Sequence, residues 1–151
     1  MNILLFLTPK KDVSYLYNDY TIRQATEKME YHRYTAIPII DRKGKYIGTL
    51  TEGDILWFIK NNNHFNLKEA ENEKILNIPR IHDNKAVNAS SDLQDIFNTA
   101  LEQNFIPVVD DNDIFIGIIT RKNIFNHFKN LINKNYILRF PLEFLFSNLF
   151  K

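Results

Sequence analysis

The sequence has no cysteine, only 4 glycines in 151 residues and almost no net charge, since 19 Lys and Arg face 18 Asp and Glu. The absence of cysteine excludes disulfides and thiol catalysis, and it agrees with a cytoplasmic protein. A formal net charge of +1 provides no basic surplus, so we expect no nucleic-acid partner. The apolar run in the opening MNILLFL is too short for a signal peptide or a membrane span, which again favours the cytoplasm and no membrane contact.

Catalytic and metal-binding patterns are also missing. The four histidines lack metal-ligand spacing and are expected at the surface or on helices: His32, His64, His82 and His127. No glycine-rich phosphate loop of the G-x-x-x-x-G-K type occurs. The acidic cluster of Asp110, Asp111 and Asp113 lacks the closing Glu of a calcium loop, so a hairpin turn explains it better. We therefore predict no catalytic residue, no metal and no enzymatic activity.

The sequence does contain one pattern that occurs twice. The stretch YTAIPIIDRKGKYIGTLTEGDILWFI begins at Tyr34, and NFIPVVDDNDIFIGIITRKNIFNHF begins at Asn104. In each copy two short β-branched runs flank a polar turn, which predicts a β-hairpin. The second run of each hairpin contains a glycine, Gly48 or Gly117. A glycine inside a strand indicates close approach by another backbone or by a ligand.

Each hairpin lies between two predicted helices. Thr51 and Thr120 are suitable N-caps for the helices that follow, because the hydroxyl accepts a hydrogen bond from a free amide. Apolar residues three and four apart predict a preceding helix in TIRQATEKMEYH and another in DLQDIFNTALEQ. We expect short extended segments before these helices, at 13–16 and 85–89. The polar stretch KNNNHFNLKEAENEK between the halves is expected to be partly helical.

These elements predict an α/β (α+β) fold of two β-α-β-β-α repeats, packed sheet to sheet because each half is small and apolar on one side. We expect the first repeat at 1–60, a linker at 61–74, the second repeat at 75–130 and an apolar C-terminal tail at 131–151. The helix Ile55 to Ile59 is apolar nearly all round, so either the partner repeat alone or a second subunit as well covers it. We predict a homodimer, and we expect the tail segment 135–150 to pack on the pair or extend the dimer contact rather than dock on a partner or a membrane.

The two copies resemble CBS domains, the cystathionine-β-synthase-type module, over roughly Thr8 to Lys129. The resemblance rests on the proline-centred strands AIPII and FIPVV, the acidic turns, and the endings GTLTEGD and GIITRKN, where the second has Asn in place of the final Asp. It implies a regulatory pair of repeats (a Bateman module) with pseudo-two-fold symmetry, of the kind found in stand-alone bacterial CBS-domain proteins. Such a pair is expected to sense AMP, ADP, ATP, S-adenosylmethionine or cyclic di-AMP and to report occupancy to an unidentified effector protein.

The resemblance also implies two ligand pockets, each built from both repeats. The first would combine the start of the last helix with the first strand and the residues before Pro38, namely Thr8, Val13, Ser14, Tyr34, Thr35, Ala36, Thr120, Arg121, Lys122 and Asn123. A helix start provides free amides and a positive dipole end, which suits a phosphate. Arg121 could clamp phosphate oxygens, Lys122 adds charge and Asn123 could bond a ribose hydroxyl. The basic pair favours a phosphorylated ligand, although a solvated helix end would have the same residues.

The second pocket has an acidic residue where the first has a basic one. It would use Thr51, Glu52, Gly53 and Asp54 together with the region of Arg80, Lys85, Ala86, Val87, Asn104, Phe105 and Ile106. Glu52 occupies the place that Arg121 has in the first pocket, and a carboxylate repels phosphate. Thr51 and Asp54 also fit a simple helix capping box. We expect this pocket to be empty or to hold only an adenosine-like moiety, and a structural dimerisation module with vestigial pockets remains the alternative function.

Overall fold

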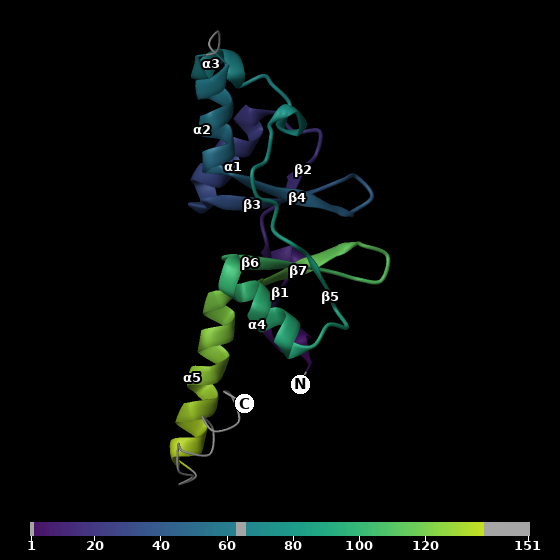
Figure 1. Cartoon of the computed structure of the whole chain (residues 1–151), viewed down its shortest axis with the longest axis vertical. Coiled ribbons are helices and arrows are strands. Elements are labelled where there is room, and N and C mark those ends of the chain that lie inside the picture. Colours follow the sequence, from purple (N-terminus) through teal and green to yellow (C-terminus); the bar gives the residue numbers. More distant parts are fainter. Residues whose placement is uncertain (1, 63–65, 138–151) are drawn as a thin grey trace.

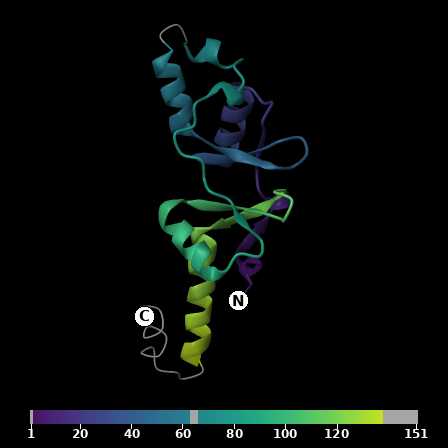
Figure 2. The ribbon, with the colours of Figure 1, turned by 45° about the vertical axis from the view of Figure 1, so that its right-hand side comes forward.

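The structure is a computed structural model, and it describes residues 2–62 and 66–137 of the chain. Two sheets lie next to each other in the middle of the molecule (Figure 1). Helices α1 (Ile22–His32) and α2 (Glu52–Asn61) lie on the outer side of one sheet, and α4 (Leu93–Glu102) and α5 (Arg121–Ile137) on the outer side of the other. The turned view in Figure 2 shows the same layers. The predicted fold of two α/β repeats packed sheet to sheet is confirmed.

The two sheets have related but unequal strand orders. The first sheet has the order β2-β3-β4, with β2 at Leu16–Tyr17, β3 at Ala36–Ile40 and β4 at Tyr46–Thr51. The second has the order β1-β7-β6-β5, with β1 at Leu7–Pro9, β5 at Val87–Asn88, β6 at Phe105–Val109 and β7 at Phe115–Thr120. A short helix α3 (Leu67–Ala70) confirms that the linker is partly helical, and 3-10 turns occupy Ile3–Phe6, Lys10–Asp12 and Ile75–Asn77.

The two hairpins are built alike, as the repeat predicts. Asp41 Oδ1 accepts hydrogen bonds from the backbone amides of Lys43 and Lys45, each at 2.8 Å. Asp110 Oδ1 does the same in the second copy, with the amides of the residues two and four positions later, each at 2.9 Å. Both hairpins also show a register shift at equivalent places, between Ile39 and Ile40 and within β6. The acidic residues are therefore turn residues that satisfy backbone amides.

The predicted helix caps are present. Thr51 Oγ1 accepts from the amide of Asp54 at 3.0 Å, and the Asp54 carboxylate accepts from the amide of Thr51, which makes a capping box. Thr120 Oγ1 accepts from the amide of Asn123 at 3.1 Å. The helix expected in TIRQATEKMEYH is α1, and it has its own capping box at Thr21. Local sequence signals therefore set where these helices begin.

The first strand of the chain joins the sheet of the other repeat. Strand β1 pairs antiparallel with β7, with Thr8 opposite Ile118 and Pro9 opposite Gly117. A Cβ atom at Gly117 would overlap the carbonyl oxygen of Thr8, so only glycine fits this crossing. The sequence did not predict β1, and the extended segment expected at 13–16 is a regular strand only from Leu16.

The segment before β5, which contains Arg80 and Asp83, lies beside β4 of the first repeat. A Cβ atom at Gly48 would overlap the carboxylate of Asp83 and lie 3.0 Å from Arg80 Nε. The close approach of another backbone is therefore confirmed at Gly117, whereas the neighbours at Gly48 are side chains and not the predicted backbone or ligand. The extended segment expected at 85–89 contains β5.

The hairpin turns and a small apolar cluster join the two repeats. The amide of Phe115 donates to the carbonyl of Gly44 at 2.9 Å, and the amide of Tyr46 donates to the carbonyl of Asp113 at 3.2 Å. Phe115 is buried together with Val13 and Ile40 in a cluster that Tyr15, Tyr17, Tyr46 and Ile118 surround. Helix α5 is described as far as Ile137, and the remainder of the tail predicted at 135–150 lies outside the described residues.

Candidate ligand site

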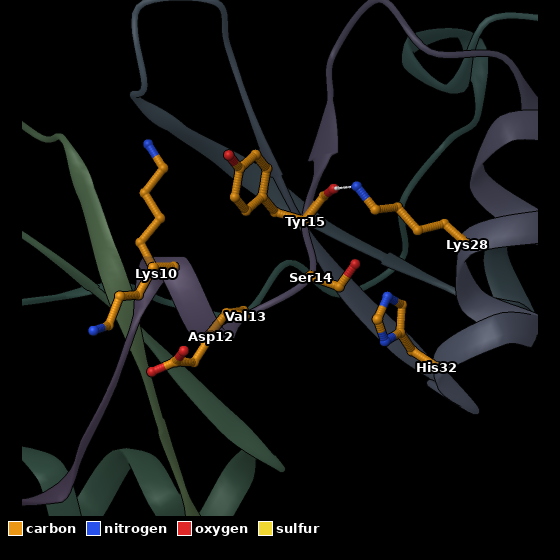
Figure 3. A pocket seen from close by; sticks show the side chains of 8 residues that line it. Lys10, Asp12, Val13, Ser14, Tyr15, Lys28 and His32 are labelled. Carbon is orange, nitrogen blue, oxygen red and sulfur yellow. Dashed lines mark hydrogen bonds between the residues drawn. The ribbon is translucent and has the colours of Figure 1, made fainter.

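A groove of about 700 Å³ opens beside the segment that joins β1 to β2 (Figure 3). Its lining consists of residues 10–15 of that segment and of two side chains of α1, Lys28 and His32. The segment is held between two strands that belong to different sheets, which fixes its course. Lys28 and His32 are four residues apart, so they lie on the same face of the helix. All of these lining residues belong to the predicted first repeat, whereas the predicted first pocket also included residues at the start of α5.

Two of the predicted ligand residues line this groove. Val13 is buried and belongs to the apolar cluster between the repeats. Ser14 Oγ is buried and makes no hydrogen bond within the described part of the chain. Figure 3 shows the Ser14 hydroxyl on the side of the groove where His32 lies. Buried polar atoms are usually hydrogen-bonded, so this hydroxyl marks a position where a ligand atom would gain a bond.

Basic and aromatic side chains form much of the wall. The ammonium groups of Lys10 and Lys28 lie 5.4 Å and 5.5 Å from the centre of the Tyr15 ring. Lys28 Nζ also donates to the Tyr15 carbonyl at 2.8 Å (Figure 3). Burial lowers the pKa of Lys28 below its ordinary value, and the nearby Tyr17 opposes this effect. The groove is therefore suited to an anionic ligand.

The residues before Pro38 adjoin the groove only in part. The Tyr34 ring stacks on His32, a lining residue, with ring centres 5.3 Å apart. The Thr35 carbonyl accepts from the amide of Glu52 at 3.0 Å, and Ala36 pairs with Thr51. The described contacts of Thr35 and Ala36 are thus with the start of α2 in their own repeat.

The start of α5 contacts the first strand, as the resemblance implied. Asn123 Nδ2 donates to the Thr8 hydroxyl at 2.8 Å and to the carbonyl of Phe6 at 3.0 Å. Thr120 caps the same turn. Thr8 and Asn123 are thus neighbours, although each already bonds the other.

Arg121 has a structural partner that the sequence did not indicate. Its Nε donates to the carbonyl of Ala100 at 2.6 Å, and a terminal nitrogen donates to the carbonyl of Leu101 at 3.1 Å. These carbonyls belong to the last turn of α4, where they lack helical partners and a cation is favourable. Lys122 is exposed. A phosphate clamped by Arg121 would therefore have to share the guanidinium with α4 or displace it.

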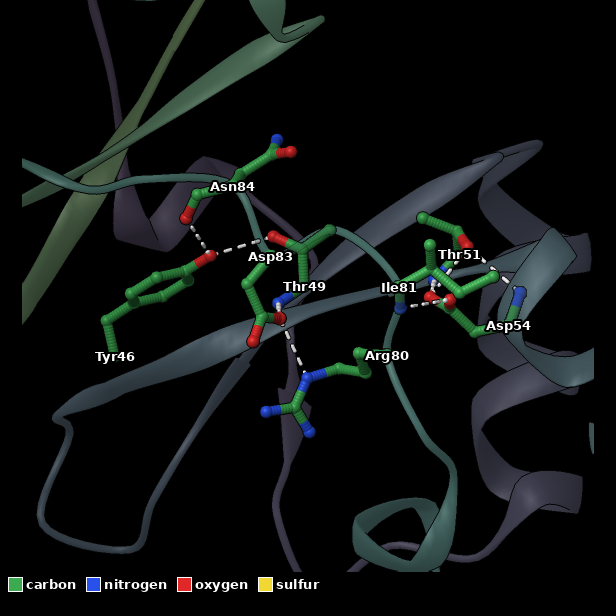
Figure 4. Close-up of polar contacts among 8 residues, drawn as sticks. All are labelled: Tyr46, Thr49, Thr51, Asp54, Arg80, Ile81, Asp83 and Asn84. Carbon is green, nitrogen blue, oxygen red and sulfur yellow. Dashed lines mark hydrogen bonds and ion pairs between the residues drawn. The ribbon is translucent and has the colours of Figure 1, made fainter.

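In the region of the second predicted pocket, polar groups bond one another (Figure 4). The buried Asp54 carboxylate accepts from Thr51 Oγ1 at 2.7 Å and from the amide of Ile81 at 3.1 Å. Asp83 Oδ1 accepts from the amide of Thr49 at 2.8 Å and from Arg80 Nε at 2.7 Å. A ligand here would have to replace these bonds, and the segment around Arg80 is part of the contact.

The other residues in and around the second predicted pocket are also buried or hydrogen-bonded within the chain. Tyr46 donates its hydroxyl to the carbonyl of Asn84 at 2.8 Å, and burial raises the pKa of Tyr46 above its usual range. Phe105 and Ile106 are buried in β6, and the carbonyl of Asn104 accepts from the amide of Arg121. Lys85 exchanges backbone hydrogen bonds with the Gln103 side chain.

Several residues of the groove were missed at the level of sequence. They are Lys10, Lys11, Asp12, Tyr15, Lys28 and His32. Two signals were present: Lys-Lys-Asp directly precedes the predicted Val13, and Lys28 and His32 have the i, i+4 spacing of one helix face. The tertiary arrangement was needed to show that this face points toward Val13.

A metal cluster and a membrane-spanning helix are both absent from the described residues. In 2–62 and 66–137, no group of three or more His, Asp or Glu side chains could hold a metal ion. Within the same residues no helix is long and apolar enough to cross a membrane.

The fold is that of two sheet-to-sheet repeats in which β1 joins the sheet of the second repeat. The sequence profile of the CBS domain matches residues 6–61 and 80–130, which is more than half of the chain. The chain belongs to the CBS-domain family, so the resemblance seen in the sequence is confirmed.

The curated relatives match this chain over only part of their own length. An uncharacterised protein of Methanocaldococcus jannaschii is 23% identical over 143 residues, which cover 87% of this chain and 51% of the relative. Homoserine O-acetyltransferase of Methanococcus vannielii is 29% identical over 117 residues, which cover 77% of this chain and 23% of the relative. The chain thus spans about half or less of the length of these relatives.

Solved structures share the fold over most of both chains. CbpB in complex with c-di-AMP has a TM-score of 0.80 at 22% identity, covering 90% of this chain and 89% of that one. CbpB of Listeria monocytogenes in complex with c-di-AMP has a TM-score of 0.74 at 19% identity, covering 84% of this chain and 94% of that one. CBSX2 in complex with AMP has a TM-score of 0.69 at 23% identity, covering 86% of this chain and 97% of that one. Adenine nucleotides are therefore ligands of proteins with this fold.

Proposed function

We propose that this chain is a regulatory module that binds an adenine nucleotide in the groove and signals its occupancy to a partner protein in the cytoplasm. The observation that carries the proposal is the groove itself. The predicted residues Val13 and Ser14 line it, and the Ser14 hydroxyl is buried without a hydrogen bond in the described chain. Its volume, about 700 Å³, lies within the usual range for small-molecule sites. The complexes of CbpB with c-di-AMP and of CBSX2 with AMP support this ligand class.

AMP, ADP, ATP and cyclic di-AMP are preferred over S-adenosylmethionine. Lys10, Lys11 and Lys28 line the groove, and only one acidic side chain, Asp12, lies among its lining residues. Phosphate oxygens gain from nearby ammonium groups, whereas the sulfonium of S-adenosylmethionine is repelled by them. The residues proposed at the opposite side of the ligand remain those at the start of α5, from Thr120 to Asn123.

A structural dimerisation module is the second candidate, and the region of the second pocket favours it. There Asp54, Asp83 and Arg80 are already bonded within the chain, so no ligand is needed to satisfy them. We propose that the second pocket stays unliganded while the groove is used.

We also propose that the module is a homodimer. Leu56 and Trp57 on α2 are 58% and 43% exposed, and Phe125 on α5 is 72% exposed. Ile55 and Ile124, their neighbours in sequence, are buried in the two repeat cores. Both helices thus have an apolar outer side, which a second copy would cover. The dimer would place the same two helices of each subunit in the interface.

Thermal unfolding with a panel of ligands tests the nucleotide-binding proposal. We expect AMP, ADP, ATP or cyclic di-AMP to raise the melting temperature, because a ligand at a hundred times its Kd stabilises the folded state by about 2.7 kcal/mol. S-adenosylmethionine and the guanine analogues GMP and cyclic di-GMP serve as comparisons.

Ser14→Ala is the matched variant. It removes a hydroxyl that has no hydrogen bond in the described chain, so the stability of the free protein should stay within about 0.5 kcal/mol or rise. The shift caused by the nucleotide should nevertheless shrink. If no adenine nucleotide shifts the wild-type protein, the dimerisation module becomes the better function.

A further inference from the structure

A second hollow, of about 430 Å³, lies on the outer side of α1, and we call it the α1 hollow. Its lining consists of Tyr20, Gln24, Glu27, Lys28, Tyr31 and His32. Positions 20, 24, 27 and 31 follow one another at steps of three and four, so they share one face of the helix. The opposite face is buried in the core of the first repeat through Ile22, Ala25 and Met29. The Tyr31 side chain is 83% exposed, so the outer face of α1 is open to a partner.

Tyrosine rings and cations alternate in and beside the α1 hollow. The centre of the Tyr20 ring lies 5.7 Å from that of Tyr17 and 5.8 Å from the ammonium group of Lys28. The guanidinium carbon of Arg42 lies 4.0 Å from the centre of the Tyr17 ring. Side chains that already hold one another lose less freedom when a partner binds. Tyrosine and arginine are also enriched among the residues that contribute most to protein–protein binding.

The acidic groups in and next to the α1 hollow are already neutralised. Glu27 pairs with Arg23 at 2.9 Å, and Asp19 pairs with Arg42 at 2.9 Å. Within residues 2–62 and 66–137, by contrast, no ion pair involves Lys28. Its ammonium group donates to a backbone carbonyl and can donate two further hydrogen bonds. The charge that complements this surface is therefore negative.

The α1 hollow and the groove share two side chains. Lys28 and His32 line both, and Figure 3 shows them directed from α1 toward the segment that joins β1 to β2. The His32 ring also contacts the ring of Tyr31 at 4.9 Å and that of Tyr34 at 5.3 Å. A nucleotide that touches either shared side chain in the groove would change the surface that a protein meets in the α1 hollow.

We propose that the α1 hollow is the docking surface of the effector protein, which places a carboxylate of an acidic segment at Lys28 and packs the segment against Tyr20 and Tyr31. Because Lys28 and His32 belong to both sites, the nucleotide and the acidic segment compete. This inference rests on the proposed nucleotide-binding function and adds where the partner reads occupancy. A second copy is the weaker candidate, since the exposed apolar side chains that it would cover lie on α2 and α5. The net charge of +1 disfavours a nucleic acid.

Selection of random phage-displayed peptides on the full chain, without nucleotide, tests the surface. We expect the enriched peptides to combine Asp or Glu with an aromatic residue. In fluorescence anisotropy, Lys28→Gln and Tyr31→Ala should each weaken such a peptide about tenfold or more. The controls are Lys68→Gln, an exposed lysine on α3, and Leu101→Ala, 80% exposed on α4, and each should change the affinity less than about twofold. Because Tyr31 is exposed, Tyr31→Ala gives an answer even if Lys28→Gln fails to fold.

Saturating AMP or cyclic di-AMP should weaken the same peptide about fivefold or more, as a coupling between sites requires. If nucleotides bind but leave the affinity of the peptide unchanged, occupancy is not read here and the inference is wrong. If acidic peptides bind while no adenine nucleotide shifts thermal unfolding, the nucleotide-binding function fails and the docking surface stands.

Three other results would overturn the inference. The first is that selection enriches no peptide, or only neutral or basic ones. The second is that a short oligodeoxythymidine binds more tightly than the peptides and is weakened by the same variants, because the surface would then recognise nucleic acid. The third is that Tyr31→Ala turns a dimer into a monomer in sedimentation, because a second copy would then cover the α1 hollow.

Discussion

Gly117→Ala tests whether the exchange of the first strand is a rigid feature of the fold. At this position β1 crosses β7, with Pro9 opposite Gly117. A methyl group would overlap the backbone carbonyl oxygen of Thr8, and it would lie 2.9 Å from Leu7 Cδ1 and 3.1 Å from Pro9 Cα. Two of these three neighbours are backbone atoms, which cannot rotate away. Strand β1 would have to shift as a unit.

The cost can be worked out from two contributions. Overpacking of a fitted contact costs about 1–3 kcal/mol. The backbone of Gly117 has φ of 156°, where side chains are rarely found, and holding alanine there costs a further 1–3 kcal/mol or so. Together the two contributions predict a loss of about 2–6 kcal/mol, a large part of the roughly 5–15 kcal/mol that stabilises an ordinary domain. At about 2–4 °C per kcal/mol, the melting temperature should fall by roughly 10 °C.

Two other glycines provide the comparison, and urea unfolding of all three variants is the assay. Gly48→Ala meets the side-chain ends of Asp83 and Arg80, which can turn aside at the loss of a bond or two, for about 1–2 kcal/mol. Gly53→Ala has its nearest neighbour at 3.6 Å and lies in α2, so it should be neutral or stabilise by up to about 1 kcal/mol. The loss of stability should therefore be largest for Gly117→Ala, smaller for Gly48→Ala and smallest for Gly53→Ala. If Gly117→Ala costs less than Gly48→Ala, the crossing is not rigid and the reasoning is refuted.

Two further predictions concern the second pocket and the dimer. Asp54→Ala removes a buried carboxylate that accepts from Thr51 and from the Ile81 amide, so it should destabilise the fold by about 2–4 kcal/mol in chemical unfolding. Asp95 occupies the same position of α4, three residues after the N-cap, but it is exposed, so Asp95→Ala should stay within about 0.5 kcal/mol. Equal effects of the two changes would contradict a structural role for Asp54. In sedimentation, the wild type should have about twice the 17.9 kDa mass of one chain, and Leu56→Asp should shift it to the monomer while Leu101→Asp, 80% exposed on α4, should not. A wild-type monomer at micromolar concentration would rule out the dimer.

The sequence by itself determined the features that depend on neighbouring residues. Thr51 and Thr120 begin helices because a hydroxyl beside free amides is stabilising wherever the chain goes next. Asp41 and Asp110 make turns because their carboxylates reach amides two and four residues later. The alternation of strands and helices in two copies then leaves few ways to bury both apolar faces, and sheet-to-sheet packing is one of them. The fold class and the family followed from these local signals.

The tertiary structure decided what depends on residues far apart in the sequence. The pairing of β1 with β7 could not be inferred, because three residues of strand carry too weak a pattern to select between two sheets. Arg121 was predicted as a phosphate ligand, but its guanidinium is 20 and 21 positions from the carbonyls that it bonds. Lys28 bonds the Tyr15 carbonyl 13 positions away, and only that packing turns a surface lysine into part of a groove. Local patterns fix which elements form, whereas the side chains that meet between elements depend on how these elements pack.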